Sequence, residues 1–343
     1  MPAGIYLAAL KHLQIIIKVK KVNISFYGEF MKKIVLISLY FGKYPNYFNL
    51  WLKSAAKNSD IDFFLYGDCD VKQYEPLPKN VKCIYVSFEN IKKKIQSKFD
   101  FEIALDTPYK ICDYRPAYGL VFQQDISDYD YWGHFDLDTI LGDLTAYLPN
   151  EDYDKIYRFG HLTMYKNTPE NNVRFMDEGG MDYQKVFKTS YNMIFDELPG
   201  MSKKYEILGL SQYCEAPFAD IARRRKNYTL NDNICRSNYK YQIFYYDNGK
   251  VFRDYLEGNE IKTDEFNYIH FSHRKMEDKT NGSDSFYITR FGFIEKNSKT
   301  TLETIKELNA PTPIENIFCS INTQIIRRIK RSFKLIYTKI TNS

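Results

Sequence analysis

Two aspartates with a single leucine between them, Asp136 and Asp138, end an aromatic segment, Tyr129–Asp138, that is predicted to be a strand. Alternate side chains of a strand point to the same side, so both carboxylates face one way while Leu137 turns into the core. Two hard oxygen ligands suit Mg²⁺ or Mn²⁺, which keeps some waters and bridges the phosphates of a nucleotide. The same short pattern also occurs where two aspartates at the end of a strand are merely solvated or cap a turn. The surrounding elements are therefore needed to choose between these interpretations.

Alternating apolar runs and amphipathic segments surround this pair. Strands are predicted at 33–40, 61–66 and 81–87, and helices at 46–57 (with Asn46 as its cap), at 91–98 and, interrupted by Pro116, at 108–122. Such alternation indicates a parallel sheet covered by helices, and such sheets bind ligands beyond the carboxyl ends of their strands. Tyr40 and Asp68 lie at two of those ends. Neither a Gly-x-Gly-x-x-Gly fingerprint after the first strand nor a P-loop motif occurs, so a nucleotide would be held in another way.

Two runs carry a resemblance to a known family: Tyr109-Lys-Ile-Cys-Asp-Tyr-Arg-Pro-Ala-Tyr-Gly119 and Tyr131-Trp-Gly-His-Phe-Asp-Leu-Asp-Thr-Ile-Leu-Gly-Asp143. They resemble a bacterial family of glycosyltransferases found in polysaccharide gene clusters and, more distantly, the GT-A glycosyltransferases. The resemblance extends from about residue 33 to about 275. It implies an α/β, GT-A-like fold, with a Rossmann-like mixed sheet flanked by helices, in a single catalytic domain. The pattern of the last thirty residues adds a C-terminal amphipathic helix to this domain.

The resemblance, together with the composition of the two ends of the chain, predicts a division into five parts. We expect an N-terminal extension outside the fold at 1–30, a nucleotide-sugar-binding half at 31–155, an acceptor-binding half of the same domain at 156–290, a linker at 291–313 and a basic helix at 314–343. In the extension, the apolar stretch Ile5–Leu10 is a poor secretory signal, because Lys11 and His12 interrupt it and no basic segment precedes it.

The same resemblance implies roles for individual residues. Asp136 and Asp138 would bind the metal, and four residues would contact the nucleotide: Tyr40, Asp68, Lys110 and Asp113. Lys110 and Asp113 are one turn apart on the predicted helix. Lys110 could instead be a solvated lysine on the helix surface, and Tyr40 could be an aromatic residue at the rim that packs on Phe41. Arg115 replaces the lysine expected from the family, and at a surface position this difference would matter little.

A histidine far down the chain often completes the metal site of GT-A enzymes, since imidazole suits Mn²⁺. Of the five histidines, His12 lies outside the expected fold, His134 is expected to be buried and structural, and His161 follows Phe159-Gly160. His270 lies in a β-like run that resembles the Tyr-Ile-His segment of the family, and we favour it over His273. Arg274 would then meet a phosphate, or else solvate the end of the strand.

Sugar transfer to a hydroxyl calls for a carboxylate near the anomeric carbon. Of three acidic pairs, Glu151-Asp152 is typical of a helix start and Asp177-Glu178 of a loop. Asp196 and Glu197 follow an apolar segment, and the family resemblance includes a Phe-Asp-Glu at this place. We therefore expect Asp196 and Glu197 to be the catalytic carboxylates on the acceptor side, with a helix cap as the alternative.

The charge and the cysteines narrow the classes of function. The net charge is +5, but the basic excess lies in 1–30 and 314–343, whereas 31–313 is slightly acidic. This distribution does not favour nucleic-acid binding. Six scattered cysteines without a Cys-x-x-Cys pair fit a reducing cytosol.

The last thirty residues predict a helix with an apolar stripe. Ile314, Phe318, Ile321, Ile325, Ile329, Phe333, Ile336 and Ile340 recur at steps of three or four, and Arg327, Arg328, Lys330, Arg331 and Lys334 occupy other faces. Such a helix binds an anionic membrane surface or packs on the domain. We expect a cytoplasmic protein that is peripheral on the inner face of the cytoplasmic membrane.

We therefore predict a glycosyltransferase that uses Mn²⁺ or Mg²⁺ to move a sugar from a nucleotide-sugar, a UDP-sugar above all, to a saccharide or lipid-linked acceptor in bacterial surface polysaccharide synthesis. One alternative is a haloacid-dehalogenase-like phosphatase using Asp136 and Asp138, although Ile140 departs from its motif and three strands precede the pair. Another is a non-catalytic, membrane-associated carbohydrate-binding protein.

Overall fold

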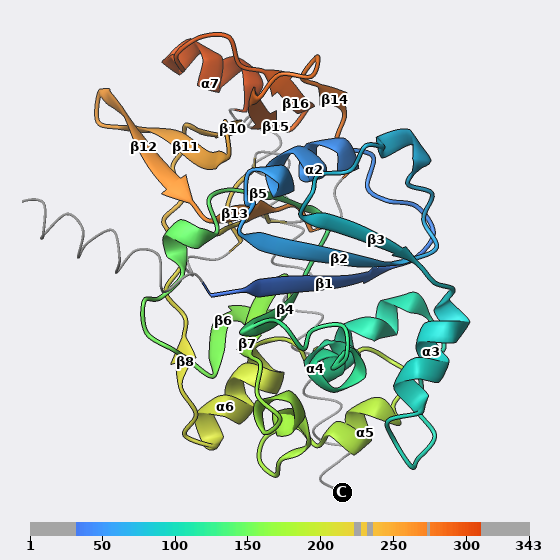
Figure 1. Ribbon diagram of the computed structural model, residues 1–343. Coiled ribbons are helices and arrows are strands. Elements are labelled where there is room, and N and C mark those ends of the chain that lie inside the picture. The colour runs from blue at the N-terminus through green and yellow to red at the C-terminus, as the bar shows by residue number, and fades with distance from the viewer. Residues whose placement is uncertain (1–31, 223–227, 232–235, 273–274, 310–343) are drawn as a thin grey trace, which may run out of the picture.

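A seven-stranded, mostly parallel sheet forms the centre of the protein, with strand order β3-β2-β1-β4-β7-β6-β8 (Figure 1). The computed structural model describes residues 32–222, 228–231, 236–272 and 275–309. Only β7 runs against its neighbours in this sheet. The strands are β1 (Ile34–Tyr40), β2 (Ile61–Gly67), β3 (Val81–Tyr85), β4 (Tyr131–Phe135), β6 (Lys155–Phe159), β7 (Leu162–Lys166) and β8 (Gln212–Tyr213). The mixed α/β fold expected from the sequence is therefore present.

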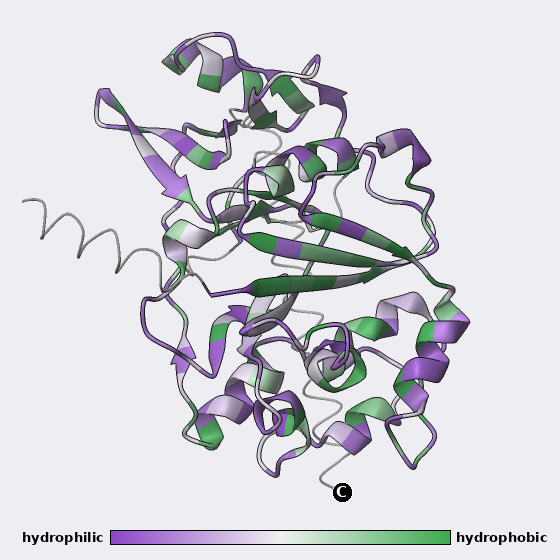
Figure 2. Ribbon diagram, in the orientation of Figure 1, coloured by the Kyte–Doolittle hydropathy of each residue, from purple (hydrophilic) through white to green (hydrophobic). Residues whose placement is uncertain are grey.

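Both faces of this sheet are buried, as in parallel sheets generally. In β1, Ile34 and Leu36 join the core that contains Trp51, whereas Val35 and Ile37 join the core on the opposite face. Figure 2 shows the hydrophobic residues concentrated on β1, β2 and β3, with hydrophilic residues along β12. Helix α2 (Phe48–Ala56) covers the first face; α3 (Phe88–Gln96), α4 (Tyr118–Val121), α5 (Tyr183–Phe187) and α6 (Lys203–Ile207) lie on the other side.

The caps of the first two helices differ from one another. Ser87 accepts a hydrogen bond from the Asn90 N–H and caps α3. The predicted cap of α2 at Asn46 is wrong, because α2 begins after Tyr47, without a side-chain cap. The Asn46 amide instead donates to the Met276 carbonyl, which belongs to the layer above.

The segment before β4 is a 3₁₀ helix, η2 (Pro108–Ala117), followed directly by α4. A 3₁₀ helix has three residues per turn, so residues three apart share a face. Prolines begin it at Pro108 and lie near its end at Pro116. Shorter turns of this kind are η1 (Lys72–Tyr74), η3 (Thr145–Tyr147) and η4 (Asn171–Met176), and η5 (Leu198–Ser202) is a π-helical turn.

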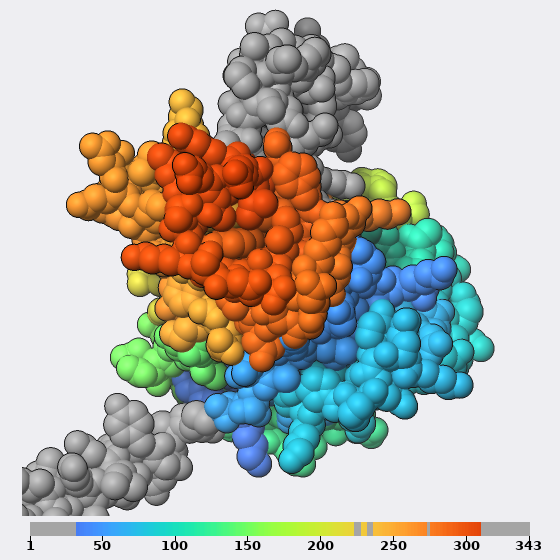
Figure 3. Space-filling view, turned by 90° about the horizontal axis from the view of Figure 1, so that it is seen from above, coloured from blue at the N-terminus to red at the C-terminus, as the bar shows by residue number. Residues whose placement is uncertain are grey.

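A six-stranded sheet with order β12-β11-β10-β15-β16-β14 forms a second layer against α2. In Figure 3 the residues of this layer, in orange, cover part of the N-terminal residues of the central sheet layer, in blue. Its members are β10 (Gln242–Asp247), β11 (Lys250–Glu257), β12 (Glu260–Phe266), β14 (Asp278–Lys279), β15 (Ser285–Thr289) and β16 (Gly292–Glu295), followed by α7 (Leu302–Leu308). Tyr47 and Leu50 share its hydrophobic core, and Lys53 forms an ion pair with Asp284 (2.9 Å).

A three-stranded sheet with order β5-β13-β9 lies between these layers. It consists of β5 (Thr139–Leu141), β9 (Ala219–Asp220) and β13 (Tyr268–His270). Strand β13 pairs antiparallel with β5 and parallel with β9. Segments more than 100 residues apart are thereby joined directly beyond the end of β4.

The two halves predicted at 31–155 and 156–290 share one sheet, because β6, β7 and β8 extend the sheet begun by β1 to β4, and their separate roles in binding donor and acceptor stay a prediction. The predicted linker is wrong. Residues 291–309 do not form a linker, because β16 pairs with β15 and α7 follows it. The predicted extension at 1–30 and the predicted helix at 314–343 lie outside the described residues. Within the described residues, no helix has the length and apolar character needed to cross a membrane.

Candidate functional site

Asp136 and Asp138 lie in the turn between β4 and β5. The predicted strand to Asp138 is wrong at its end, because β4 stops at Phe135 and the chain turns before β5 begins at Thr139. Leu137 is buried in the core, as predicted. In the β5–β13 pairing Thr139 is opposite His270, and this register brings the histidine beside both aspartates.

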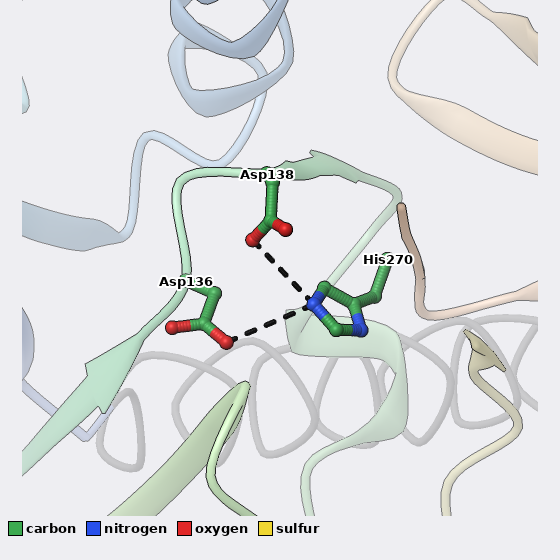
Figure 4. Close-up of side chains that lie close together, drawn as sticks. All are labelled: Asp136, Asp138 and His270. Carbon is green, nitrogen blue, oxygen red and sulfur yellow. Dashed lines mark ion pairs between the residues drawn. The ribbon is translucent and has the colours of Figure 1, made fainter. Parts of the chain in front are cut away.

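The side chains of Asp136, Asp138 and His270 converge (Figure 4). His270 Nε2 lies 3.7 Å from Asp136 Oδ2 and 3.4 Å from Asp138 Oδ1. One ligand atom from each residue lies within 4.8 Å of the other two. Two carboxylate oxygens and one imidazole nitrogen form a donor set that fits Mn²⁺ or Mg²⁺.

The neighbouring carboxylates shift the pKa of His270. Burial favours the neutral ring, but hydrogen bonds to Asp138 and Asp220 and the charge of Asp136 outweigh it and raise the pKa of His270 well above its usual range. Without a cation, the imidazolium therefore offsets part of the charge of the aspartates. Asp220, in β9, was not anticipated from the sequence, because a two-residue strand has no periodic pattern.

These three residues line a cavity of about 520 Å³ at the carboxyl end of the central sheet. Its walls come from the end of β1, from η2, from the β4–β5 turn, from residues 192–197 and from the end of β13. The sequence-predicted residues on its wall are Tyr40, Asp136, Asp138, Asp196, Glu197 and His270.

Of the two residues predicted at strand ends, only Tyr40 reaches the cavity. It stacks on Tyr44 with ring centroids 5.7 Å apart, and burial raises its pKa to about 12, so the phenol stays protonated. Asp68 is exposed and does not line the cavity, and its predicted contact with a nucleotide stays a prediction. Asp68 Oδ1 accepts the Gly42 N–H (2.7 Å) and so holds the loop after β1, where Gly42 has a φ of 94°.

Lys110 and Asp113 are not on the cavity wall, so their predicted contact with a nucleotide is wrong. Both side chains are fully buried and form an ion pair of 2.7 Å. Lys110 Nζ also donates to the carbonyls of Val186 (3.0 Å) and Tyr191 (2.9 Å). The carboxylate of Asp113 accepts the N–H groups of Met193 (2.7 Å) and Phe195 (2.8 Å). The pair therefore fastens the segment 191–195 that leads to Asp196.

The 3₁₀ geometry of η2 explains this outcome. Tyr109, Cys112 and Arg115, three residues apart, all line the cavity, whereas Lys110 and Asp113 belong to the adjacent face. The predicted surface position of Arg115 is wrong as well, since its side chain is only 13% exposed. Arg115 forms ion pairs with Asp136 and with Asp196 (2.8 Å), and it donates to the Gly160 carbonyl (2.9 Å).

Asp196 and Glu197 also line the cavity. Burial raises the pKa of Asp196 to about 7 even though Arg115 lowers it, and burial also raises the pKa of Glu197. Gly160 leaves room for both carboxylates: a Cβ there would lie 2.5 Å from Asp196 Oδ2 and 2.9 Å from Glu197 Oε1. Sequence reasoning placed Gly160 beside His161 but missed this role.

The remaining predicted residues lie elsewhere. His134 is buried, as expected, with Nδ1 at 3.0 Å from the Gly160 carbonyl. Glu151-Asp152 does not begin a helix, since β6 follows at Lys155; Asp177 lies in a loop, as predicted, and pairs with Arg174. His273 and Arg274 lie outside the described residues.

Comparisons with known proteins give one family match. Residues 36–297 match the model of a family described as "Family of unknown function (DUF6625)". No curated protein matches the sequence.

Solved structures of glycosyltransferases show low similarity to this chain. Mouse xyloside xylosyltransferase 1, in its apo form, has a TM-score of 0.31 and 7% identity, over 55% of this chain and 88% of that one. The glycosyltransferase GlyE of Streptococcus pneumoniae TIGR4 in its apo form has a TM-score of 0.30 and 13% identity, over 54% of this chain and 45% of that one. A second GlyE structure has a TM-score of 0.26 and 16% identity, over 47% and 44%. This chain thus spans less than half of the GlyE chains.

Proposed function

We propose that this chain, which belongs to the family of unknown function DUF6625, is a metal-dependent glycosyltransferase that moves a sugar from a nucleotide-sugar to an acceptor hydroxyl. The observation that carries the proposal is the convergence of Asp136, Asp138 and His270 on the wall of a cavity at the carboxyl end of the sheet. Open α/β sheets bind ligands at that edge, and the donor set suits Mn²⁺ or Mg²⁺.

The donor half of the proposal rests on the wall formed by β1, η2 and the β4–β5 turn. A divalent cation held by the three ligands would offset the charge of a diphosphate leaving group. Tyr40 offers a nucleotide base an aromatic face, and Arg115 offers phosphate oxygens a guanidinium. The resemblance of the runs 109–119 and 131–143 to glycosyltransferases favours a UDP-sugar as the donor.

The acceptor half rests on Asp196 and Glu197. With a pKa of about 7, Asp196 exchanges a proton near neutral pH, as a general base for an acceptor hydroxyl must. Arg115 orients its carboxylate through Oδ2. Glu197 lies beside it on the same cavity wall and positions the acceptor.

The acceptor class and the location are proposed from the sequence alone. Its resemblance to enzymes of polysaccharide gene clusters favours a saccharide or lipid-linked acceptor in surface polysaccharide synthesis. The basic, apolar-striped segment 314–343 would hold the enzyme at the inner face of the cytoplasmic membrane, where such an acceptor is presented.

Turnover assays with a set of UDP- and GDP-sugars and Mn²⁺ test the proposal. We expect release of one nucleoside diphosphate, faster with the right acceptor saccharide, in the wild type and in Asp128→Asn, an exposed control outside the cavity. Asp138→Asn should be inactive. Phosphate ester hydrolysis that disappears in Asp136→Asn, without turnover of any sugar nucleotide, would replace this proposal with the phosphatase hypothesis.

A further inference from the structure

We infer that Asp220 is a positioning residue of the metal site: it holds His270 so that Nε2 of the imidazole faces Asp136 and Asp138. This inference rests on the proposed function, because it concerns the same three ligands. Asp220 was not indicated by any sequence motif, and it lies in strand β9, apart from the elements that carry the three ligands.

The contact is fixed by the pairing of β9 with β13. In this parallel ladder Asp220 and His270 are partners in register. Asp220 Oδ1 lies 2.8 Å from Nδ1 of His270, and both side chains are largely buried, at 15% and 12% exposure. A hydrogen bond at this depth is shielded from competing water, so it constrains the ring strongly.

Other residues hold the carboxylate of Asp220 itself. Asn231 Nδ2 donates to Oδ2 over 3.0 Å, and Ser272 Oγ donates to Oδ1 over 3.3 Å. The Asn231 N–H also donates to the Asp220 carbonyl (2.6 Å). Asp220 is therefore a fixed acceptor for the histidine rather than a mobile acid.

The position of this acceptor determines which nitrogen is available. A carboxylate accepts hydrogen bonds, so Nδ1 of His270 carries a hydrogen directed at Asp220. The lone pair of the neutral ring is then on Nε2, the atom 3.4 Å from Asp138 and 3.7 Å from Asp136. Ligating histidines are commonly oriented in this way, through the nitrogen that does not bind the metal.

A second contact fixes the plane of the ring. His161 stacks on His270 with centroids 4.8 Å apart and planes at 24°, and Tyr268 Oη lies 2.7 Å from Nδ1 of His161. Stacking still permits the ring to flip by 180° about the Cβ–Cγ bond, and the hydrogen bond between Nδ1 and Asp220 selects one of these two orientations.

Titration with Co²⁺ alone tests the inference, because visible absorption of Co²⁺ reports both affinity and ligand set. The variants are Asp220→Ala, Asp220→Asn and His270→Ala, with Asp254→Asn as control. Asp254 is also a buried aspartate in a strand, but it lies in the six-stranded sheet, where its carboxylate accepts a hydrogen bond from the hydroxyl of Thr263. We expect Asp220→Ala to weaken Co²⁺ binding roughly 10–100-fold and to broaden the spectrum. Asp220→Asn retains an acceptor without the charge, so its loss should be smaller. Asp254→Asn should match the wild type.

The outcomes separate this inference from the proposed function. If His270→Ala loses Co²⁺ while both Asp220 variants keep the affinity and spectrum of the wild type, Asp220 does not position the ligand and only this inference fails. If the wild type and His270→Ala bind Co²⁺ equally weakly, the metal site fails and the inference with it. Thermal unfolding of each variant is recorded alongside. Should Asp220→Ala not fold, the nearly isosteric Asp220→Asn decides: weakened binding supports the inference and unchanged binding overturns it.

Discussion

Nη1 of Arg115 donates a hydrogen bond to Oδ2 of Asp196 over 2.8 Å, and the Nη2 of the same guanidinium contacts Asp136. One buried side chain thus joins an aspartate of the metal cluster to the carboxylate proposed to receive the acceptor proton. The metal cluster and the proposed catalytic carboxylate are therefore coupled electrostatically. A change of charge at Asp136 should alter the pKa of Asp196.

Asp196→Asn should lower turnover by about 10²–10⁴-fold, because the variant has no base for the acceptor hydroxyl. Its affinity for Mn²⁺ should stay at the wild-type level, since Asp196 is not one of the three ligands. In the wild type, turnover should rise with pH through about 7, where Asp196 ionises. Steady-state kinetics from pH 5.5 to 8.5, with calorimetry of Mn²⁺ binding, measure both effects. Wild-type turnover in Asp196→Asn would exclude it as the base.

The raised pKa of Asp196 also predicts a stability effect of defined sign. Its folded-state pKa of about 7 lies above the unfolded value of 3.8, so the folded state holds a proton that the unfolded state loses. Stability from this proton is present below pH 4 and is lost as the pH rises through 7. The Tm of Asp196→Asn relative to wild type should therefore increase from pH 5 to pH 8. A difference that stays constant with pH would mean that burial does not shift this group.

Gly160→Ala should impair catalysis without removing the metal. The new methyl group would lie 2.5 Å from Asp196 Oδ2, so the carboxylate must move away from Arg115. A displacement of about 1 Å in a catalytic group costs on the order of 100-fold in rate. Turnover and Mn²⁺ affinity measured on the same preparation check this expectation. Normal turnover would show that the carboxylates have space that the structure does not provide.

The Lys110–Asp113 pair should matter for stability and not for nucleotide contact. Asp113→Leu leaves the buried ammonium of Lys110 without its counter-ion and the N–H groups of Met193 and Phe195 without their acceptor, and breaking such a pair costs about 3–5 kcal/mol. The double variant Lys110→Met, Asp113→Leu should lose less than the sum of the two single changes, because no charge remains buried alone. Urea unfolding of the four proteins in this double-mutant cycle measures the coupling; additive losses would contradict the contact.

Binding of Mn²⁺ should tighten as the pH rises. The pKa of His270 is raised without a cation, so Nε2 must release a proton before it can ligate. Affinity should therefore increase with pH until the raised pKa of His270 is passed. His270→Gln, which has no proton to release, should bind more weakly and with a shallower pH dependence. Equal slopes in the two proteins would remove His270 from the ligand set.

The strands and the shared site of the two aspartates could be predicted from the sequence, because both depend on residues that are close together along the chain. Apolar runs predict β1, β2 and β3, and the spacing of Asp136 and Asp138 predicts that they share a site. Asp220 could not be found in this way, because its role depends on a two-strand pairing across 50 residues.

The face of η2 was assigned incorrectly for a related reason. The sequence analysis assumed an α-helix, which did not show that Arg115 and Lys110 belong to different faces. In the observed 3₁₀ helix, Tyr109, Cys112 and Arg115 share one face and line the cavity. The choice between these two helices depends on tertiary contacts, such as those of Lys110 with the carbonyls of Val186 and Tyr191. Charge and spacing alone did not contain that information.

Calorimetric titration of UDP, with and without Mn²⁺, tests whether Asp136, Asp138 and His270 bind a nucleotide through a metal ion. We expect UDP to bind the wild type and Asp128→Asn only with Mn²⁺ present, and we expect Asp136→Asn and Asp138→Asn to abolish this binding while their folds persist by circular dichroism. UDP binding that is independent of both Mn²⁺ and the aspartates would contradict the metal site. Absence of binding by UDP and GDP, with Mn²⁺ still bound at Asp136 and Asp138, would contradict a glycosyltransferase.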